Sequence, residues 1–172
     1  MTTLTVIGGL PGTGKSTVSL LVAELVGAPF VRVDRIEQAI VAWSALSHPV
    51  GPAGYAVAHA VAMEQLQLGL SVVVECVNPS ALTRDAWMGT ASAGGGNLLE
   101  VELICSDERE HQRRVTMRGT DVDGLVKPTW QEVARREYEP WRREHLVIDT
   151  ATETPRLSAA RIAAAMDSAG GG

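Results

Sequence analysis

The chain has 172 residues, 45% of them hydrophobic, which is the size and composition of one globular domain with a substantial core. Its formal net charge of −5 argues against general binding to nucleic acids or membrane surfaces, because such binding needs an excess of positive charge on one face. Small-molecule ligands are favoured instead. The chain starts without a basic segment and a long apolar core, and no apolar run approaches the roughly 20 residues that span a bilayer, so we expect a cytoplasmic protein that binds no membrane.

The first elements are an apolar run at residues 4–7, which predicts a buried β-strand, and a helical pattern at residues 19–26 that ends at Gly27. The segment between them matches G-x-x-x-x-G-K-S, the signature of a P-loop that binds nucleoside triphosphates. The residues that we expect to contact the nucleotide are Gly9, Leu10, Pro11, Gly12, Thr13, Gly14, Lys15, Ser16 and Thr17.

Each residue type in this signature has a physical reason. Glycines allow the backbone to wrap closely around phosphate oxygens and to present its N–H groups to them. The ammonium of Lys15 is expected to reach the β- and γ-phosphates, and the hydroxyl of Ser16 to coordinate Mg²⁺. The dipole of the following helix favours an anion at its N-terminus. We therefore expect ATP and Mg²⁺ as ligands, the alternative being a glycine-rich turn that binds no nucleotide.

The second βα unit is predicted from a short strand at residues 28–33 and a helix at about residues 36–46. Asp34 and Arg35 lie between them, where the carboxyl end of a parallel strand faces the ligand crevice. Asp34 is a candidate general base, or a carboxylate that orients an acceptor hydroxyl. The alternative role is an N-cap of the following helix, which is compatible with the first.

The third unit combines a helix at residues 55–68 with a nearly continuous β-branched strand at residues 71–77. Glu75 interrupts this strand, and a buried carboxylate beside the phosphate loop is expected to serve either the magnesium ion or the acceptor. Asn78 follows in a turn and is placed with the substrate-facing residues. Arg84 is expected either to bind an anionic part of the acceptor or to be a solvated arginine at a helix end.

The second half of the chain begins with a strand at residues 98–105 and a helix at residues 107–118, with acidic residues early and basic residues late. Arg114 and Arg118 are one turn apart and precede a segment rich in glycine and aspartate, so we expect a lid at about residues 114–130. At least one of Arg113, Arg114 and Arg118 is expected to neutralise charge on the transferring phosphoryl group.

The last part of the chain contains a capping pattern, with Thr129 preceding Glu132 by three residues, that predicts a helix to about residue 138. A strand at residues 145–150 and a helix at residues 155–166 complete the α/β pattern, and residues 168–172 are expected to fray. Asp149 and Thr150 end the last strand, where they are expected either to line the adenine pocket or to cap a helix.

Together these segments resemble the small P-loop kinases grouped around zeta-toxin, gluconate kinase, adenylylsulfate kinase and chloramphenicol phosphotransferase. The resemblance covers nearly the whole chain and depends most on residues 9–17. It implies a three-layer α/β fold in which a five-stranded parallel sheet has the order 2-3-1-4-5. It also implies that Asp34 acts as base or substrate anchor, and that Arg114 and Arg118 hold the ATP phosphates. Family members commonly have Asp where this chain has Glu75.

The sequence therefore predicts a single domain, residues 1–172, that transfers the γ-phosphate of ATP to a hydroxyl group of a metabolite, nucleoside or antibiotic. Relatives that phosphorylate antibiotics make a resistance-type phosphotransferase one candidate. The alternatives are a nucleotide hydrolase that acts as a switch and a binding module without catalysis. The identity of the acceptor stays open, as does the oligomeric state, with a homodimer as one option.

Overall fold

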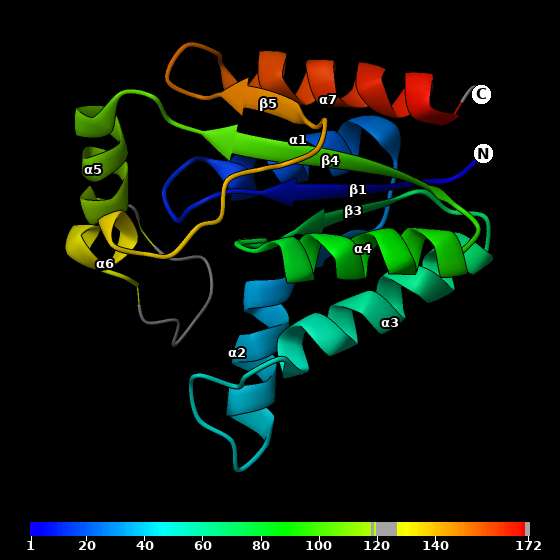
Figure 1. The fold of residues 1–172 in the computed structure, drawn as a ribbon, viewed down its shortest axis with the longest axis horizontal. Coiled ribbons are helices and arrows are strands. Elements are labelled where there is room, and N and C mark those ends of the chain that lie inside the picture. The colour runs from blue at the N-terminus through cyan, green and yellow to red at the C-terminus, as the bar shows by residue number, and fades with distance from the viewer. Residues whose placement is uncertain (118, 120–126, 171–172) are drawn as a thin grey trace.

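The computed structural model describes residues 1–117, 119 and 127–170. A five-stranded parallel sheet forms the centre of the molecule in the order β2-β3-β1-β4-β5 (Figure 1). This confirms the order implied by the family resemblance. The strands are β1 (Thr3–Gly8), β2 (Phe30–Arg32), β3 (Val72–Glu75), β4 (Asn97–Ile104) and β5 (Leu146–Asp149).

Helices cover both faces of this sheet (Figure 1). One face carries α1 and α7, and the other carries α3 and α4, with α2 packed beside α3. The short helix α6 lies with α5 beyond the carboxyl ends of the strands. The helices are α1 (Lys15–Val26), α2 (Val33–Trp43), α3 (Ala53–Gln67), α4 (Ala81–Ala93), α5 (Glu108–Met117), α6 (Trp130–Ala134) and α7 (Pro155–Gly170).

The central strands have almost no polar alternation because both of their faces are buried. Leu4 and Val6 of β1 point into the core beneath α3 and α4, whereas Ile7 points into the core beneath α1 and α7. The same alternation separates Val72 from Val73 in β3. The side chains of these five residues are fully buried. A rigid sheet of this kind fixes where the residues at its carboxyl edge lie.

Several predicted boundaries were wrong. Helix α2 begins at Val33, directly after β2, so that Asp34 lies in its first turn and Arg32 occupies the N-cap position. The capping box of Thr129 and Glu132 is confirmed, but α6 ends at Ala134 rather than near residue 138. The chain between α6 and β5 forms no helix or strand, and its carbonyls at Glu139 and Pro140 accept hydrogen bonds from the guanidinium of Arg84.

The end of α7 also differs from the prediction of a frayed terminus. The helix continues to Gly170, whose carbonyl oxygen accepts a hydrogen bond of 3.0 Å from the N-terminal ammonium. The side-chain amide of Asn97 donates to the carbonyl of Ala169. The two contacts attach the last turn of α7 to the start of the chain and to the start of β4.

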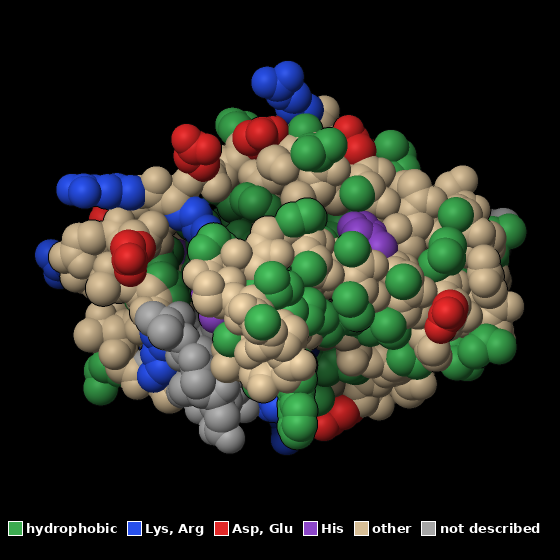
Figure 2. Space-filling view, turned by 90° about the horizontal axis from the view of Figure 1, so that it is seen from below, with side chains coloured by type: hydrophobic (Ala, Val, Ile, Leu, Met, Phe, Trp, Pro, Cys, Tyr) green, Lys and Arg blue, Asp and Glu red, His purple; other side chains and the backbone are tan. Residues whose placement is uncertain are grey.

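The outer face of α3 is unusually poor in charge. Glu64 is the only Asp, Glu, Lys or Arg of this helix, and Val57 and Val61 are 43% and 37% exposed. Figure 2 shows hydrophobic side chains gathered over the middle of this side of the molecule. Among the described residues, no helix is both long enough and apolar enough to cross a membrane.

Candidate active site

The P-loop connects β1 to α1 and forms a tight backbone turn over the carboxyl end of the sheet. Gly9, Gly12 and Gly14 all have positive φ, at 143°, 86° and 90°. A Cβ atom at Gly9 would lie 2.3 Å from the carbonyl oxygen of Leu103, and one at Gly12 would lie 2.5 Å from a methyl group of Val115. Glycine is required at these two positions for both backbone conformation and close packing.

Hydrogen bonds hold the loop in this shape. The hydroxyl of Thr13 and the ammonium of Lys15 both donate to the carbonyl oxygen of Leu10, each at 2.9 Å. The ring Nε2 of His111, on α5, lies 2.8 Å from the carbonyl oxygen of Pro11. Lys15 is only 8% exposed and lines the main cavity. Its charge is therefore held at the entrance to α1, where the helix dipole and the loop N–H groups favour an anion.

Ser16 is part of a compact polar triangle beside the loop. Its hydroxyl donates to Glu75 Oε1 at 2.7 Å, and Arg32 Nη2 donates to the same hydroxyl oxygen at 3.1 Å. Arg32 Nε also lies 2.9 Å from Glu75 Oε2, and the two side chains are 13% and 5% exposed. Strand pairing brings two of the three residues together, since Arg32 and Glu75 are paired across β2 and β3.

The donor atoms of Ser16 and Glu75 fit a magnesium ion. Mg²⁺ prefers oxygen ligands and is usually held by one or two side chains together with phosphate oxygens and water. Because the Ser16 hydroxyl hydrogen points to Glu75, the hydroxyl oxygen has lone pairs to offer to a cation. The described residues contain no group of three or more His, Cys, Asp or Glu side chains that would hold a metal alone.

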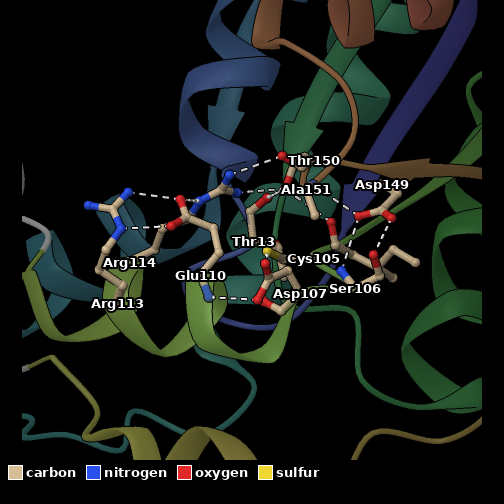
Figure 3. Close-up of polar contacts among 11 residues, drawn as sticks. Thr13, Cys105, Ser106, Asp107, Glu110, Arg113, Arg114, Asp149, Thr150 and Ala151 are labelled. Carbon is tan, nitrogen blue, oxygen red and sulfur yellow. Dashed lines mark hydrogen bonds and ion pairs between the residues drawn. The ribbon is translucent and has the colours of Figure 1, made fainter.

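Thr150 joins the loop to α5 and to the end of β5 (Figure 3). Its hydroxyl donates to the carbonyl oxygen of Thr13 at 2.8 Å and accepts a hydrogen bond of 2.8 Å from Arg114 Nη1. A second bond runs from Arg114 Nη2 to the Thr150 carbonyl oxygen at 3.0 Å. This contact was not expected, because the two threonines are 137 positions apart in the sequence.

Glu110 holds the arginines of α5 in place (Figure 3). It is paired with Arg113 at 2.6 Å and with Arg114 at 2.7 Å. The guanidinium of Arg113, followed by that of Arg114, lowers the pKa of Glu110 to about 2. Arg114 lines the cavity, whereas the side chain of Arg113 is 58% exposed and does not. Of the two, Arg114 is the arginine placed to meet a phosphate.

Asp149 lies on the other side of Thr150. Its carboxylate accepts hydrogen bonds from the backbone N–H and the hydroxyl of Ser106, and from the N–H of Ala151 (Figure 3). Burial acts in the opposite direction, but these bonds hold the pKa of Asp149 below its ordinary value. Asp149 therefore joins the ends of β4 and β5, and neither it nor Thr150 lines the main cavity.

The P-loop opens into a cavity of about 1570 Å³ that continues to the start of α2. Asp34 and Arg35 line it, as sequence reasoning expected. Glu37, one turn further along α2, also lines it, and its side chain packs so closely on Gly54 that a Cβ there would lie 2.3 Å from Glu37 Cγ. Burial, and then the carboxylate of Asp34, raise the pKa of Glu37. Two carboxylates thus face the far end of the cavity.

Two of the residues expected at the acceptor lie outside this cavity. Asn78 is completely buried behind the loop, and its backbone N–H donates to the hydroxyl of Tyr55 at 3.2 Å. The guanidinium of Arg84 is 5.3 Å from the ring centre of Tyr138 and 4.1 Å from that of Trp141. Its nitrogens donate to three carbonyl oxygens, those of Asn78, Glu139 and Pro140. Arg84 therefore attaches the extended chain after α6 to α4. Arg118 and residues 120–126 of the expected lid lie outside the described residues.

Sequence reasoning missed three residues of the site: Arg32, Glu37 and Arg136. Arg32 was missed because its partner lies on another strand. Glu37 follows Asp34 by three residues, and this helical spacing would have placed both on one face of α2. Arg136 lies beyond α6 in the sequence, yet it lines the cavity and acts on the carboxylate of Glu37.

No family model matches this sequence, and a comparison with curated sequences finds no match. Solved structures do match. A sugar kinase from Janibacter aligns over 97% of this chain and 95% of its own, with a TM-score of 0.69 and 18% identity. The chain has the fold of the small P-loop kinases.

Two further structures agree with this. A gluconokinase from Sinorhizobium meliloti aligns over 95% of each chain, with a TM-score of 0.60 and 23% identity. The APS kinase of Mycobacterium tuberculosis, solved with AMPPNP and APS, aligns over 96% of this chain and 98% of its own, with a TM-score of 0.70 and 18% identity. At this level of identity the similarity establishes the fold, and function has to be argued from the site.

Proposed function

We propose that this protein is an ATP-dependent kinase that transfers the γ-phosphate to a hydroxyl group of a small molecule. The observation that carries the proposal is one cavity that contains both Lys15 and Ser16 of the P-loop and the carboxylate of Asp34. Its volume of about 1570 Å³ exceeds the roughly 300–1,000 Å³ of a typical pocket for one ligand. This leaves room for an acceptor beside the nucleotide, which a simple binding module does not need.

At the nucleotide end, the chain's contribution is positioning and charge. The loop N–H groups and Lys15 bind the phosphates, and Arg114 reaches the same cavity from α5. Magnesium, when bound by Ser16, supplies positive charge to the phosphate oxygens. These cationic groups stabilise the negative charge that spreads over the phosphoryl group during transfer.

At the acceptor end, Asp34 is proposed to orient the acceptor and to take its hydroxyl proton. The acceptor oxygen then forms a bond to the γ-phosphorus, while the bond from that phosphorus to the β,γ-bridging oxygen breaks and ADP leaves. Glu37 and Arg136 are close enough to act on each other's charge and would contact other polar groups of the acceptor. The acceptor proposed on this basis is a polar, hydroxyl-bearing molecule such as a sugar, nucleoside or antibiotic.

The test is an ADP-release assay with Mg²⁺ and ATP over a panel of sugars, nucleosides and hydroxylated antibiotics. Release that requires one class of compound, with a mass gain of one phosphoryl group, would support the proposal. ADP formation that requires none of these compounds would indicate hydrolysis. Nucleotide binding with no ADP formation would indicate a regulatory module.

Asp34→Asn sharpens this test. We expect kcat to fall by about 10²–10⁴-fold, the usual contribution of a general base, while calorimetry shows unchanged ADP affinity. The matched control is Asp167→Asn on the exposed side of α7, which removes one carboxylate far from the cavity. Unchanged turnover in Asp34→Asn would remove Asp34 from the chemistry.

A further inference from the structure

The strongest unexplained feature of the site is a guanidinium at the position where a P-loop enzyme is expected to hold its metal ion. Arg32 Nη2 donates to the Ser16 hydroxyl oxygen at 3.1 Å, and Arg32 Nε is 2.9 Å from Glu75 Oε2. Ser16 donates in turn to Glu75 Oε1 at 2.7 Å. One arginine thus contacts both the hydroxyl that would coordinate Mg²⁺ and the carboxylate that accepts the hydrogen of that hydroxyl.

The pairing of β2 with β3 makes Arg32 and Glu75 neighbours. Arg32 is the last residue of β2 and is paired with Glu75, the last residue of β3. Glu75 is 4% exposed, and a buried carboxylate without a counter-charge is costly. The guanidinium meets this requirement. A magnesium ion would meet it equally well, because it also brings positive charge to the same oxygens.

A metal ion and the Arg32 guanidinium would lie side by side at this position. The Ser16 hydroxyl donates its one hydrogen to Glu75, and one of its two lone pairs accepts a hydrogen bond from Arg32. A metal bound to Ser16 would use the remaining lone pair. It would also place a divalent charge within a few ångströms of the guanidinium, at a site largely screened from water, where repulsion is strong.

We infer that Arg32 is a displaceable counter-ion that occupies the magnesium position of the P-loop and leaves it when a metal-bound nucleotide enters. This inference rests on the proposed nucleotide binding. Arg32 and Asp34 lie in the same cavity wall, two residues apart.

The first experiment measures ADP affinity by calorimetry, once with Mg²⁺ and once with EDTA, in the wild type and in Arg32→Gln. Without metal, Arg32 remains in the wild type to offset the repulsion between Glu75 and the phosphates. In the variant this repulsion is unopposed. We expect removal of Mg²⁺ to weaken ADP binding about tenfold more in the variant than in the wild type. The measure is the ratio of the dissociation constant for ADP in EDTA to that in Mg²⁺.

The control is Arg156→Gln, which removes one positive charge from an exposed position on α7. Its ratio should equal that of the wild type. An equal ratio in Arg32→Gln as well would overturn the inference. Should Arg32→Gln fail to fold by circular dichroism, Arg32→Lys decides the question. A lysine keeps the charge but has a single nitrogen and cannot contact Ser16 and Glu75 through two separate nitrogens as arginine does. The ratio of the dissociation constant in EDTA to that in Mg²⁺ should therefore still rise by about threefold.

The second experiment uses Mn²⁺ as a paramagnetic probe on the nucleotide-free protein, followed by electron paramagnetic resonance. Arg32→Gln should bind Mn²⁺ at least about fivefold more tightly than the wild type, and adding Glu75→Gln should remove this gain. Equal Mn²⁺ affinity in wild type and Arg32→Gln would overturn the inference. If the wild type bound no ADP in the first experiment, the proposed function would fail, and the Mn²⁺ result would still decide the role of Arg32.

Discussion

The two ends of the main cavity are built in different ways. At the nucleotide end the polar contacts run largely to backbone atoms, such as those of Lys15 to Leu10 and Thr150 to Thr13, and these side chains are nearly buried. At the acceptor end, charged side chains from α2 and from the chain after α6 face one another, and Arg136 is exposed.

This difference follows from what each end has to bind. Phosphate groups have one geometry, so a fixed backbone turn and a few buried side chains suffice, and the same turn serves any nucleoside triphosphate. An acceptor has a shape of its own, which loops and helix surfaces can match with side chains. We therefore expect substitutions at the nucleotide end to weaken nucleotide binding, and substitutions at the acceptor end to change turnover or acceptor selectivity while nucleotide binding persists.

The largest expected effect is that of Gly12→Ala. Its positive φ costs an alanine about 1–2 kcal/mol, and its Cβ would collide with Val115. The loop must then shift, so we expect ADP affinity to fall by about 100-fold or more by calorimetry. Gly27→Ala is the control, because Gly27 also has positive φ but has open space around it. Equal ADP affinity in the two variants would contradict the claim that a fixed backbone turn binds the nucleotide.

Thr150→Val should have an effect of intermediate size, which is a decrease in the stability of the fold. Valine has the same shape but cannot donate to the Thr13 carbonyl oxygen or accept from Arg114. Leaving such buried groups unpaired costs about 1–3 kcal/mol, which urea unfolding should show as a lower midpoint with an unchanged slope. Thr152→Val, at an exposed position, should change stability by less than about 0.5 kcal/mol. Equal midpoints in the two variants would contradict the role of Thr150.

Of the three substitutions, Gly54→Ala should have the smallest effect on nucleotide binding. The new methyl group would displace the side chain of Glu37, so we expect the KM for the acceptor to change by about tenfold while ADP affinity stays constant. Gly89→Ala, on an open surface of α4, should leave both unchanged and raise stability by about 0.5–1 kcal/mol. A loss of ADP affinity in Gly54→Ala would show that the two ends are not independent.

The acceptor end shows most clearly where sequence reasoning was incomplete. Asp34 was recognised because a carboxylate after a short strand has a known place in parallel α/β folds. Arg84 was expected either to bind an anionic part of the acceptor or to be a solvated arginine at a helix end, yet it is buried and its guanidinium donates to three backbone carbonyls. Its local sequence did not indicate this, since two of the three carbonyls, those of Glu139 and Pro140, belong to a segment about 55 positions away.

The sequence by itself determined the position of the P-loop and the succession of strands and helices. These features depend on local properties, namely glycine's conformational freedom and the spacing of apolar residues. Only the tertiary structure decided that Arg32 contacts Ser16 and Glu75, and that Thr150 and Arg114 brace the loop. Crossover connections separate parallel strands in sequence, so packing sets which strand ends meet and which of their side chains touch.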